Sequence, residues 1–391
     1  MHVAVDTPSS FFFHKLTSYV NTSTSMLSVM CRVLGTGAGI SGLVRVVSVV
    51  GVRGSEGGTT RISRALHITM TQLAQNSHFN KPTASNDLPR PGGIASFMRL
   101  PVHTTTEDLD ACFIGVPLDV GTSNRSGTRL GPRQIRCESV LLRPYNSVTG
   151  AAPFNCLNVG DVGDVPCNIF NLPVACENIR EYYVKVIANG CIPLTLGGDH
   201  TITYPILQAI KAKRGTVGLV HVDAHSDVSD TMLGAKITHG TPFRRALEED
   251  LIDPRATYQI GLRGSCHTED GNAWQLSKGF NVVTAEECWH KSLTPLMEEI
   301  RAKMGDRPVY LSFDIDAIDP GFCPGTGTPE IGGLTPIQAL EIVRGCRGLN
   351  LVGCDLVEVC PPYDFEGTTA LTGANLLFEM LCTLPGVVTR K

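Results

Sequence analysis

The sequence predicts an α/β fold built on a doubly wound parallel sheet. From about Leu109 onward, short apolar runs alternate with helical patterns, and this β-α-β-α order is typical of parallel sheets. Several of the runs are continuous stretches of Val, Ile and Leu without polar alternation, as expected of strands that helices bury on both faces. In such sheets, functional residues gather at the carboxyl ends of the strands.

The expected elements follow one another in regular order along the chain. Strands are expected at residues 112–116, 192–196, 217–222, 257–260, 281–283, 309–313 and 351–356. Helices are expected at residues 178–188, 204–213, 242–249, 295–304, 336–344 and 370–381. Four of these helices have a proline near their start, where the missing N–H has no partner to lose.

The composition is that of an ordinary globular protein. The chain has 391 residues, 42% of them apolar and 18% charged, with a net charge of -4. These values exclude a disordered, collagen-like or coiled-coil chain and argue against a strongly basic nucleic-acid-binding protein. The 14 cysteines are scattered without any CxxC pair, so we expect reduced, mostly buried thiols rather than a disulfide framework.

The N-terminal segment has a different charge balance. Residues 1–90 hold eight basic and three acidic residues, a net charge of +5, whereas the remainder is net -9. We interpret residues 1–75 as a mitochondrial transit peptide, which predicts a location in the matrix. A plain disordered extension is one alternative. A membrane or secretory signal is the other, but Arg45 interrupts the short apolar run at 38–52. Residues 76–100 are expected to be a linker, and residues 101–391 the catalytic domain.

Carboxylates and histidines follow three of the expected strands. One such Asp alone is more often a helix N-cap, and a lone histidine such as His221 is more often a core residue with its hydrogen bonds satisfied. Residues i, i+2 and i+4 of an extended chain lie on one face, however, so these side chains can converge. The convergent set is His200, Asp223, His225, Asp227, Asp314 and Asp316.

The convergent set predicts a dinuclear metal site. Four clustered carboxylates without cations would repel one another and raise their pKa values, whereas two divalent cations would balance the four charges. Oxygen and imidazole ligands without cysteine favour Mn(II) over zinc, with Ni(II) or Co(II) as alternatives. Two ions about 3.5–4 Å apart can share and activate one water molecule.

Three segments resemble the signature segments of the ureohydrolase (arginase/agmatinase) family. They read GGDHTITYP at 197–205, VDAHSD at 222–227 and SFDIDAIDPGFCPGTGTPEIGGLT at 312–335. Two further segments, THGTPF at 238–243 and DLVEVCPPYD at 355–364, resemble agmatinase-type members, which include guanidino acid hydrolases. The resemblance extends from about Leu109 to Leu384.

The resemblance implies a three-layer α/β/α sandwich with a mostly parallel sheet, two Mn(II) ions per subunit and a trimer or hexamer. Its substrate would be a small guanidino compound, with neither nucleic acid nor membrane as a partner. Carried onto this sequence, His200 and Asp227 would bind one metal and His225 and Asp316 the other. Asp223 and Asp314 would bridge the two metals.

The resemblance also implies the reaction, hydrolysis of a guanidino group to urea and an amine. His239 resembles the family's proton-transfer histidine, although a loop histidine is more often a surface or capping residue. Glu358 resembles the residue that pairs with the guanidinium, a pairing that suits a bidentate carboxylate. Its alternative interpretation is a buried ion-pair partner of Arg or Lys.

The tail of the substrate leaves two interpretations open. Agmatine ends in an ammonium group, and a guanidino acid such as 4-guanidinobutanoate ends in a carboxylate that Arg or Lys would bind. Arg125 and Lys236 lie in the two loops that can hold this information, and they favour the guanidino acid slightly. Two further alternatives are a catalytically silent relative that binds a ligand, and a formiminoglutamate hydrolase.

Overall fold

The computed structural model of this chain divides into two units, Met1–Ser77 and His78–Lys391. In the first unit the structure describes four short strands, which form two antiparallel pairs. In the second it describes residues 79–266 and 269–389. Most of the predicted transit peptide lies outside the described residues. The four strands are β1 (His2–Val5), β2 (Phe12–Lys15), β3 (Met30–Val33) and β4 (Val46–Val50).

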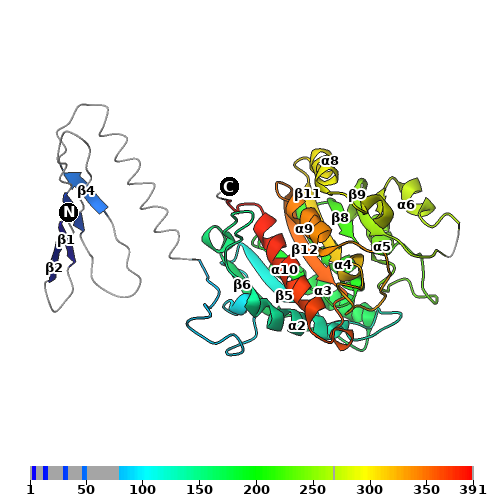
Figure 1. Cartoon of the computed structure of the whole chain (residues 1–391), viewed down its shortest axis with the longest axis horizontal. Coiled ribbons are helices and arrows are strands. Elements are labelled where there is room, and N and C mark those ends of the chain that lie inside the picture. The colour runs from blue at the N-terminus through cyan, green and yellow to red at the C-terminus, as the bar shows by residue number, and fades with distance from the viewer. Residues whose placement is uncertain are drawn as a thin grey trace. The chain divides into compact units, whose positions relative to one another are not determined.

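The second unit is built on an eight-stranded sheet (Figure 1). Its strands are β5 (Ala111–Gly115), β6 (Val159–Asp164), β7 (Ile192–Leu196), β8 (Val217–Val222), β9 (Ile252–Leu262), β10 (Asn281–Thr284), β11 (Pro308–Asp314) and β12 (Asn350–Val357). They are arranged in the order β10-β9-β8-β11-β12-β7-β5-β6, and every neighbouring pair is parallel. The predicted parallel sheet is therefore confirmed.

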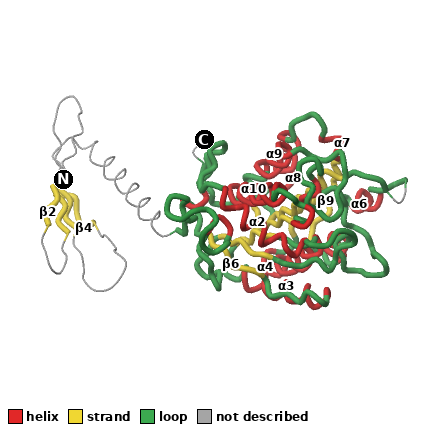
Figure 2. The backbone as a smooth tube through the Cα atoms, turned by 60° about the horizontal axis from the view of Figure 1, so that its bottom comes forward, coloured by secondary structure: helices red, strands yellow, loops and turns green. Residues whose placement is uncertain are grey.

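Helices cover both faces of this sheet (Figures 1 and 2). One layer contains α2 (Gly131–Glu138), α8 (Thr294–Met304), α9 (Pro336–Gly345) and α10 (Thr368–Thr383), which contribute to one hydrophobic core. The other contains α3 (Leu172–Val186), α4 (Thr203–Arg214) and α5 (Pro242–Glu248), which contribute to a second core. Two short helices, α6 (Ala273–Lys278) and α7 (Ala285–Cys288), follow β9 and β10. Among the described residues, no helix has the length and apolar composition that a membrane span requires.

The pleat of the strands divides their side chains between the two cores. In β5, Ala111 and Phe113 belong to the first core, whereas Cys112 and Ile114 belong to the second. All four are fully buried, because alternate side chains of a strand point to opposite faces and each face here is covered by helices. The continuous apolar runs are thus strands that helices bury on both faces, as predicted. The three-layer sandwich is confirmed.

The edge strand β6 is absent from the sequence prediction. Its sequence, VGDVGD, holds two glycines and two aspartates, which are typical of turns. Arg136 of α2 compensates both acids, with Nε 2.8 Å from Asp161 Oδ2 and Nη1 2.5 Å from Asp164 Oδ1. Arg136, a partner from another element, therefore allows this sequence to form a strand. No local sequence pattern predicts β6.

The described part of the predicted linker is folded onto the domain. Phe97 is fully buried and stacks on Phe113, with ring centroids 3.8 Å apart. The backbone N–H of Phe97 donates to Asp161 Oδ2 at 2.7 Å. Arg99, which is 6% exposed, donates to the backbone carbonyls of Leu88 and Thr83. Residues 79–100 are thus a part of the folded domain, although their Pro, Gly and Asn content is typical of a linker.

Phe97→Ala should destabilise the domain by about 3–5 kcal/mol, because it opens a cavity against Phe113. Chemical denaturation of the full chain measures this change. Ile94→Ala is the matched control, because Ile94 lies in the same segment with 75% of its surface exposed, and its loss should stay within about 0.5 kcal/mol. Equal, small effects of both variants would contradict the placement of Phe97 in the core.

Candidate active site

The candidate site lies where four neighbouring strands end. The strands β8, β11, β12 and β7 are adjacent in the centre of the sheet, and the predicted metal ligands follow β7, β8 and β11. The chain leaves the centre after β8, forms β9 and β10 outside it, and returns to place β11 between β8 and β12. Because parallel strands share a carboxyl edge, this crossover collects side chains that are distant in sequence.

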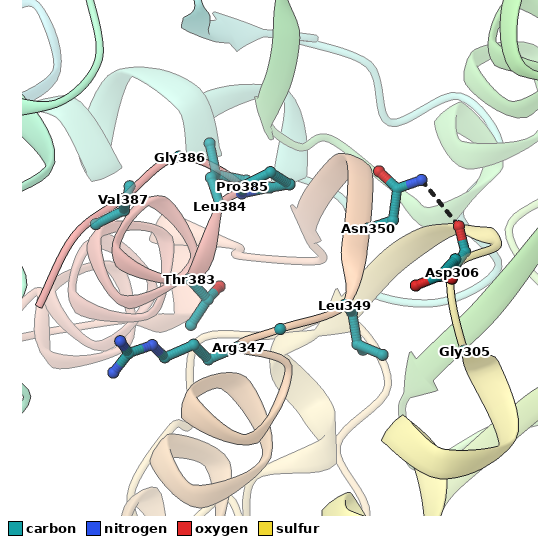
Figure 3. A pocket seen from close by; sticks show the side chains of 11 residues that line it. Gly305, Asp306, Arg347, Leu349, Asn350, Thr383, Leu384, Pro385, Gly386 and Val387 are labelled. Atoms are coloured by element: carbon teal, nitrogen blue, oxygen red, sulfur yellow. Dashed lines mark hydrogen bonds between the residues drawn. The ribbon is translucent and has the colours of Figure 1, made fainter.

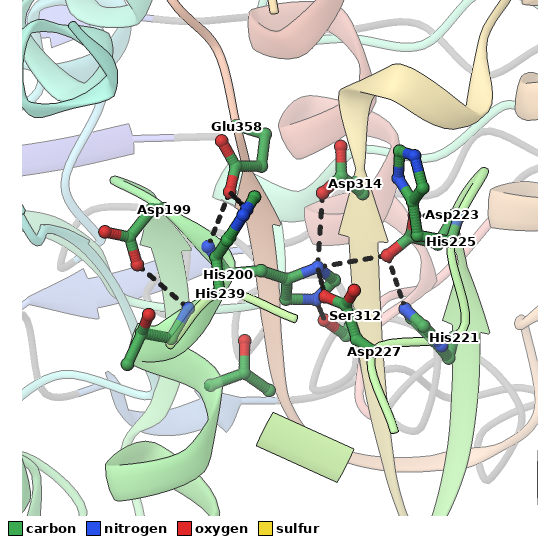
Figure 4. A network of polar contacts seen from close by, with 12 residues as sticks. Asp199, His200, His221, Asp223, His225, Asp227, His239, Ser312, Asp314 and Glu358 are labelled. Carbon is green, nitrogen blue, oxygen red and sulfur yellow. Dashed lines mark hydrogen bonds and ion pairs between the residues drawn. The ribbon is translucent and has the colours of Figure 1, made fainter. Parts of the chain in front are cut away.

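The first cluster surrounds the Nδ1 atom of His200 (Figure 4). Oδ2 atoms of three aspartates approach this nitrogen, at 3.1 Å from Asp223 and 3.2 Å from both Asp227 and Asp314. His200 is completely buried, and its Nδ1 has no hydrogen-bond partner. One imidazole nitrogen and three carboxylates therefore converge on one point inside the protein.

A hydrogen bond at the second ring nitrogen of His200, Nε2, fixes the tautomer of the ring. Ser312 Oγ donates to Asp355 Oδ1 at 2.7 Å, so it accepts from His200 Nε2, which lies 2.9 Å away. Asp355 also accepts from Thr203 and Tyr310, each at 2.8 Å. With its proton on Nε2, the neutral form of His200 turns the Nδ1 lone pair toward the three carboxylates. A cation at that point would relieve the repulsion, so the donor set fits a divalent metal ion.

The second cluster shares Asp223 with the first. His225 Nδ1 lies 3.1 Å from Asp316 Oδ2 and 3.5 Å from Asp223 Oδ1. Asp223 thus directs one oxygen to each histidine, the arrangement that a bridging ligand needs. Asp223, His225 and Asp316 form one of two groups of described residues whose donor atoms are close enough for a metal ion.

The other such group contains His221, together with His200 and Asp223. His221 is fully buried, with Nε2 2.8 Å from Asp223 Oδ2 and Nδ1 2.9 Å from Gln259 Nε2. The Gln259 amide also donates to the Ser226 carbonyl, so its nitrogen faces the ring and His221 Nδ1 accepts. The His221 proton is therefore on Nε2 and points at Asp223. His221 therefore orients the Asp223 carboxylate and has no free lone pair to offer a metal ion.

Burial and neighbouring like charges oppose the ionisation of two carboxylates in the cluster. Burial, together with the charges of Asp316 and Asp223, raises the pKa of Asp314 well above its usual range. Burial also raises the pKa of Asp316. Both shifts express the cost of keeping several carboxylates charged in one buried place.

Two residues of the site adopt backbone conformations that side chains rarely take. Asp227 has φ 52° and Glu358 has φ 63°. Such left-handed residues are strained and persist where the surrounding structure holds them, often at functional sites. Both residues place a carboxylate against His200: Asp227 contacts its ring nitrogen and Glu358 its backbone N–H.

Glu358 and His239 lie against each other beside the first cluster. Glu358 is 1% exposed, and its Oε1 accepts the backbone N–H of His200 at 2.9 Å and faces His239 Nδ1 at 3.3 Å. Its Oε2 is buried and has no partner. Burial of the His239 ring favours its neutral form, but the hydrogen bond and charge of Glu358 outweigh this and raise the pKa of His239 to about 9.

A cavity of about 750 Å³ opens onto this cluster. His225, Asp227, Asp314 and His239 are among its lining residues. The predicted Arg125 and Lys236 are absent from its lining: Arg125 packs over the Tyr363 ring at 4.8 Å, and Lys236 is exposed. The structure therefore brings together eight of the ten predicted site residues.

A second cavity, of about 610 Å³, lies at the opposite edge of the sheet, near the starts of β11 and β12 (Figure 3). Asp306, Arg347 and Asn350 are among its polar lining residues. Neither of the candidate metal-binding groups among the described residues lies in this cavity.

Sequence reasoning missed the residues that orient the predicted ones. Ser312, Asp355 and Gln259 are fully buried polar residues inside β11, β12 and β9. A polar residue in an otherwise apolar strand was the available signal, because buried polar groups need partners. Ser123 is a further case: it lies in the loop after β5 and carried no signal of its own.

The sequence pattern of the Arginase family matches residues 109–382. This chain belongs to the Arginase family. The agmatinase of Gallus gallus mitochondria is 64% identical to it over 313 residues, which are 80% of this chain and 92% of that protein. The guanidinobutyrase of Pseudomonas aeruginosa is also 64% identical, over 81% of this chain and 100% of its own length.

Solved structures of the Arginase family share the fold. The proclavaminate amidino hydrolase of Streptomyces clavuligerus superposes with a TM-score of 0.71 at 39% identity, covering 75% of this chain and 99% of that one.

Asp314→Asn should lower the metal content of this Arginase-family protein, because it removes one of the four charges that would balance two cations. Elemental analysis of the purified variant, and its melting temperature with and without added Mn(II), measure the loss. Asp306→Asn, at the exposed edge of the second cavity, is the matched control and should bind metal like the unchanged protein. Two tightly bound metals in Asp314→Asn would contradict the assignment of Asp314 as a ligand that both metals need.

Proposed function

We propose that this protein is a metal-dependent hydrolase that converts a linear guanidino compound to urea and the corresponding amine. The observation that carries the proposal is the juxtaposition of two metal-ligating clusters with a buried carboxylate oxygen, Glu358 Oε2, that lacks a partner. Relatives with 64% identity over nearly their whole length are named for reactions of this class. We further propose a guanidino acid such as 4-guanidinobutanoate as the preferred substrate.

The metal pair is assigned to the six converging side chains. His200 and Asp227 would hold one ion and His225 and Asp316 the other, with Asp223 and Asp314 between them. Oxygen and imidazole donors without cysteine favour two Mn(II) ions, with Ni(II) or Co(II) as alternatives. Bound there, the pair would supply an activated water as the nucleophile at neutral pH.

Glu358 binds the guanidinium in this proposal. A guanidinium offers paired N–H donors in one plane, and a carboxylate accepts them in a charge-assisted contact. Glu358 Oε1 is already engaged by His200 and His239, whereas Oε2 is unsatisfied and buried. A guanidinium would supply the missing donor, and this contact would place its carbon beside the metal ligands.

His239 supplies the proton for the departing amine. Amines leave as neutral molecules only when they are protonated, so the group that serves them must hold a proton at neutral pH. The pKa of His239, raised to about 9, meets this condition. His239 also lines the cavity, so its ring can reach the substrate.

The substrate tail distinguishes guanidino acids from agmatine. We propose that Arg125 or Lys236 attracts the carboxylate of a guanidino acid. Arg263 lines the cavity but is an unsuitable partner, because its three nitrogens donate to the backbone carbonyls of five residues. These carbonyls belong to Gly261, Asp316, Ala317, Glu330 and Ile331.

Agmatine is the second candidate substrate, and one observation favours it. Glu286 is an exposed carboxylate that lines the outer part of the cavity, where it could attract an ammonium group. The Gallus gallus relative is named an agmatinase. The two candidates differ in the sign of the charge that the outer cavity must attract.

We also propose a homo-oligomer, trimeric or hexameric, located in the mitochondrial matrix. The net charge of +5 over residues 1–90 supports import, as does the mitochondrial relative of Gallus gallus. The partners proposed are the small-molecule substrate and further copies of this chain, without nucleic acid or membrane.

A urea-release assay over five compounds tests the proposed function. We expect turnover of 4-guanidinobutanoate above that of 3-guanidinopropanoate, agmatine, arginine and formiminoglutamate. Preference for agmatine would make the protein an agmatinase. Absence of urea from every compound by the metal-loaded protein would indicate a catalytically silent relative.

Variants that remove one charge identify the residue that binds the charged end of the substrate. Arg125→Ala or Lys236→Ala should lower kcat/KM for 4-guanidinobutanoate roughly tenfold to hundredfold, the effect of losing one charge-assisted hydrogen bond. Both variants should spare agmatine. Glu286→Gln is the matched variant of opposite sign, and it should impair only agmatine. Equal losses for both substrates in Arg125→Ala would assign this residue a structural role.

Fusion of residues 1–90 to a fluorescent reporter tests the localisation. The fusion should enter mitochondria, because its positive charge and scarcity of acids suit import. The same reporter fused to residues 79–391 is the control and should remain outside. A cytosolic or secreted 1–90 fusion would contradict the matrix location.

A further inference from the structure

We propose that Ser123 is a positioning residue for His239, which it holds at the ring nitrogen Nε2. Ser123 lies in the loop after β5, 116 residues before His239 in the chain, and both residues line the cavity. This inference rests on the proposed function, in which His239 protonates the departing amine.

Two atoms of Ser123 contact the same ring nitrogen. Ser123 Oγ lies 2.7 Å from His239 Nε2, and the backbone N–H of Ser123 donates to that nitrogen at 3.2 Å. A backbone N–H can only donate, so it favours a lone pair on Nε2. A hydroxyl can donate to neutral imidazole or accept from the charged ring, so Ser123 Oγ can bond Nε2 in both protonation states.

The opposite nitrogen of the ring faces Glu358. Nδ1 lies 3.3 Å from Glu358 Oε1, so the imidazole is held at both ends and its plane is fixed between two loops. Asp199 and Asp227 are the other charged groups that act on the ring, and both favour its charged form. Ser123 is thus the contact at Nε2 that remains neutral while the ring gains or loses its proton.

The loop that carries Ser123 is itself bonded to the segment that carries His239. Asp199 Oδ2 accepts the backbone N–H of Gly121 at 2.8 Å, and the carbonyl of Gly121 accepts the backbone N–H of His239 at 3.1 Å. A Cβ at Gly121 would lie 2.1 Å from Thr201 Oγ1, so only glycine permits this approach. Asn124 secures the other side of the loop by donating to the Gly327 carbonyl at 3.0 Å.

These contacts define what Ser123 does during proton transfer. While His239 is charged, Nε2–H donates to Ser123 Oγ. That proton then passes to the amine nitrogen of the departing group. The Ser123 hydroxyl rotates and donates a hydrogen bond to the lone pair that is left on Nε2. Ser123 keeps its proton throughout, and the ring keeps its orientation. Positioning of this kind maintains the alignment on which general acid catalysis depends.

Kinetics of Ser123→Ala test the inference on the full-length, metal-loaded protein. We expect kcat for urea release to fall roughly tenfold to hundredfold, with KM within about twofold and the metal content unchanged, because the hydroxyl acts through His239. Ser123→Thr should restore most of kcat, because it returns a hydroxyl to the same carbon. Ser126→Ala is the matched control from an exposed position of the same loop, and it should behave like the unchanged protein.

A second measurement is independent of turnover. NMR titration of ¹⁵N-labelled histidines, with His239 assigned from His239→Asn, reports the pKa of the ring. Ser123→Ala should lower this pKa by about one unit, because it removes the acceptor of the charged ring and leaves the backbone donor in place. A merely structural role of Ser123 would lower the melting temperature without this shift.

The two measurements separate the failure of this inference from the failure of the proposed function. Unchanged kcat and unchanged His239 pKa in Ser123→Ala would overturn the role of Ser123 while the unchanged protein still releases urea. If the unchanged protein releases no urea, the proposed function fails, and the His239 pKa alone decides whether Ser123 holds the ring. An equal fall of kcat in Ser126→Ala would also contradict the inference, because it would show a general effect of the loop.

Discussion

Crowding of buried negative charge is the constraint on which the rest of the structure depends. Asp223, Asp227 and Asp314 each approach one imidazole nitrogen of His200 to within 3.2 Å, and Asp316 lies beside them in the second cluster. In an apolar core, such charges are stable only when each carboxylate is oriented and a positive charge can be shared among them. The surrounding elements provide the orientation, and the donor set suits cations.

Orientation comes from hydrogen bonds deep in the sheet. Ser312 and Asp355, on neighbouring strands, turn the His200 lone pair toward the carboxylates. Gln259 fixes the same tautomer in His221, but there the Nε2–H itself points at a carboxylate, that of Asp223. Each of these partners sits inside a strand whose register is set by buried apolar neighbours, so the packing of the sheet and the direction of the ligands are one arrangement.

Loops complete the site by placing residues against His200 and His239. Glu358, in a left-handed conformation at the end of β12, contacts the backbone of His200 and the ring of His239. The loop after β5 reaches the same ring from the other side through Ser123. Strand ends therefore concentrate the carboxylates, and loops held by backbone hydrogen bonds place the groups that we propose for substrate binding and proton transfer.

The sequence by itself determined the parallel sheet and most of the site. Both depend on local periodicity: continuous apolar runs indicate strands buried on two faces, and the i, i+2 spacing puts Asp223 and His225, or Asp314 and Asp316, on one side of a chain end. Signature segments extended this to His239 and Glu358. The charge of the first ninety residues predicts a mitochondrial transit peptide, and most of that segment lies outside the described residues.

Only the tertiary structure decided which segments meet. The insertion of β11 between β8 and β12, the stacking of Phe97 on Phe113 and the bond from Ser123 to His239 join parts of the chain that no local pattern relates. Arg125 depends on the fold in the same way, because its charge predicts a binding residue but only the structure shows that its side chain packs on Tyr363. Periodicity is a property of neighbouring residues, but side-chain direction in a loop depends on contacts with distant segments, which only the folded chain brings into reach.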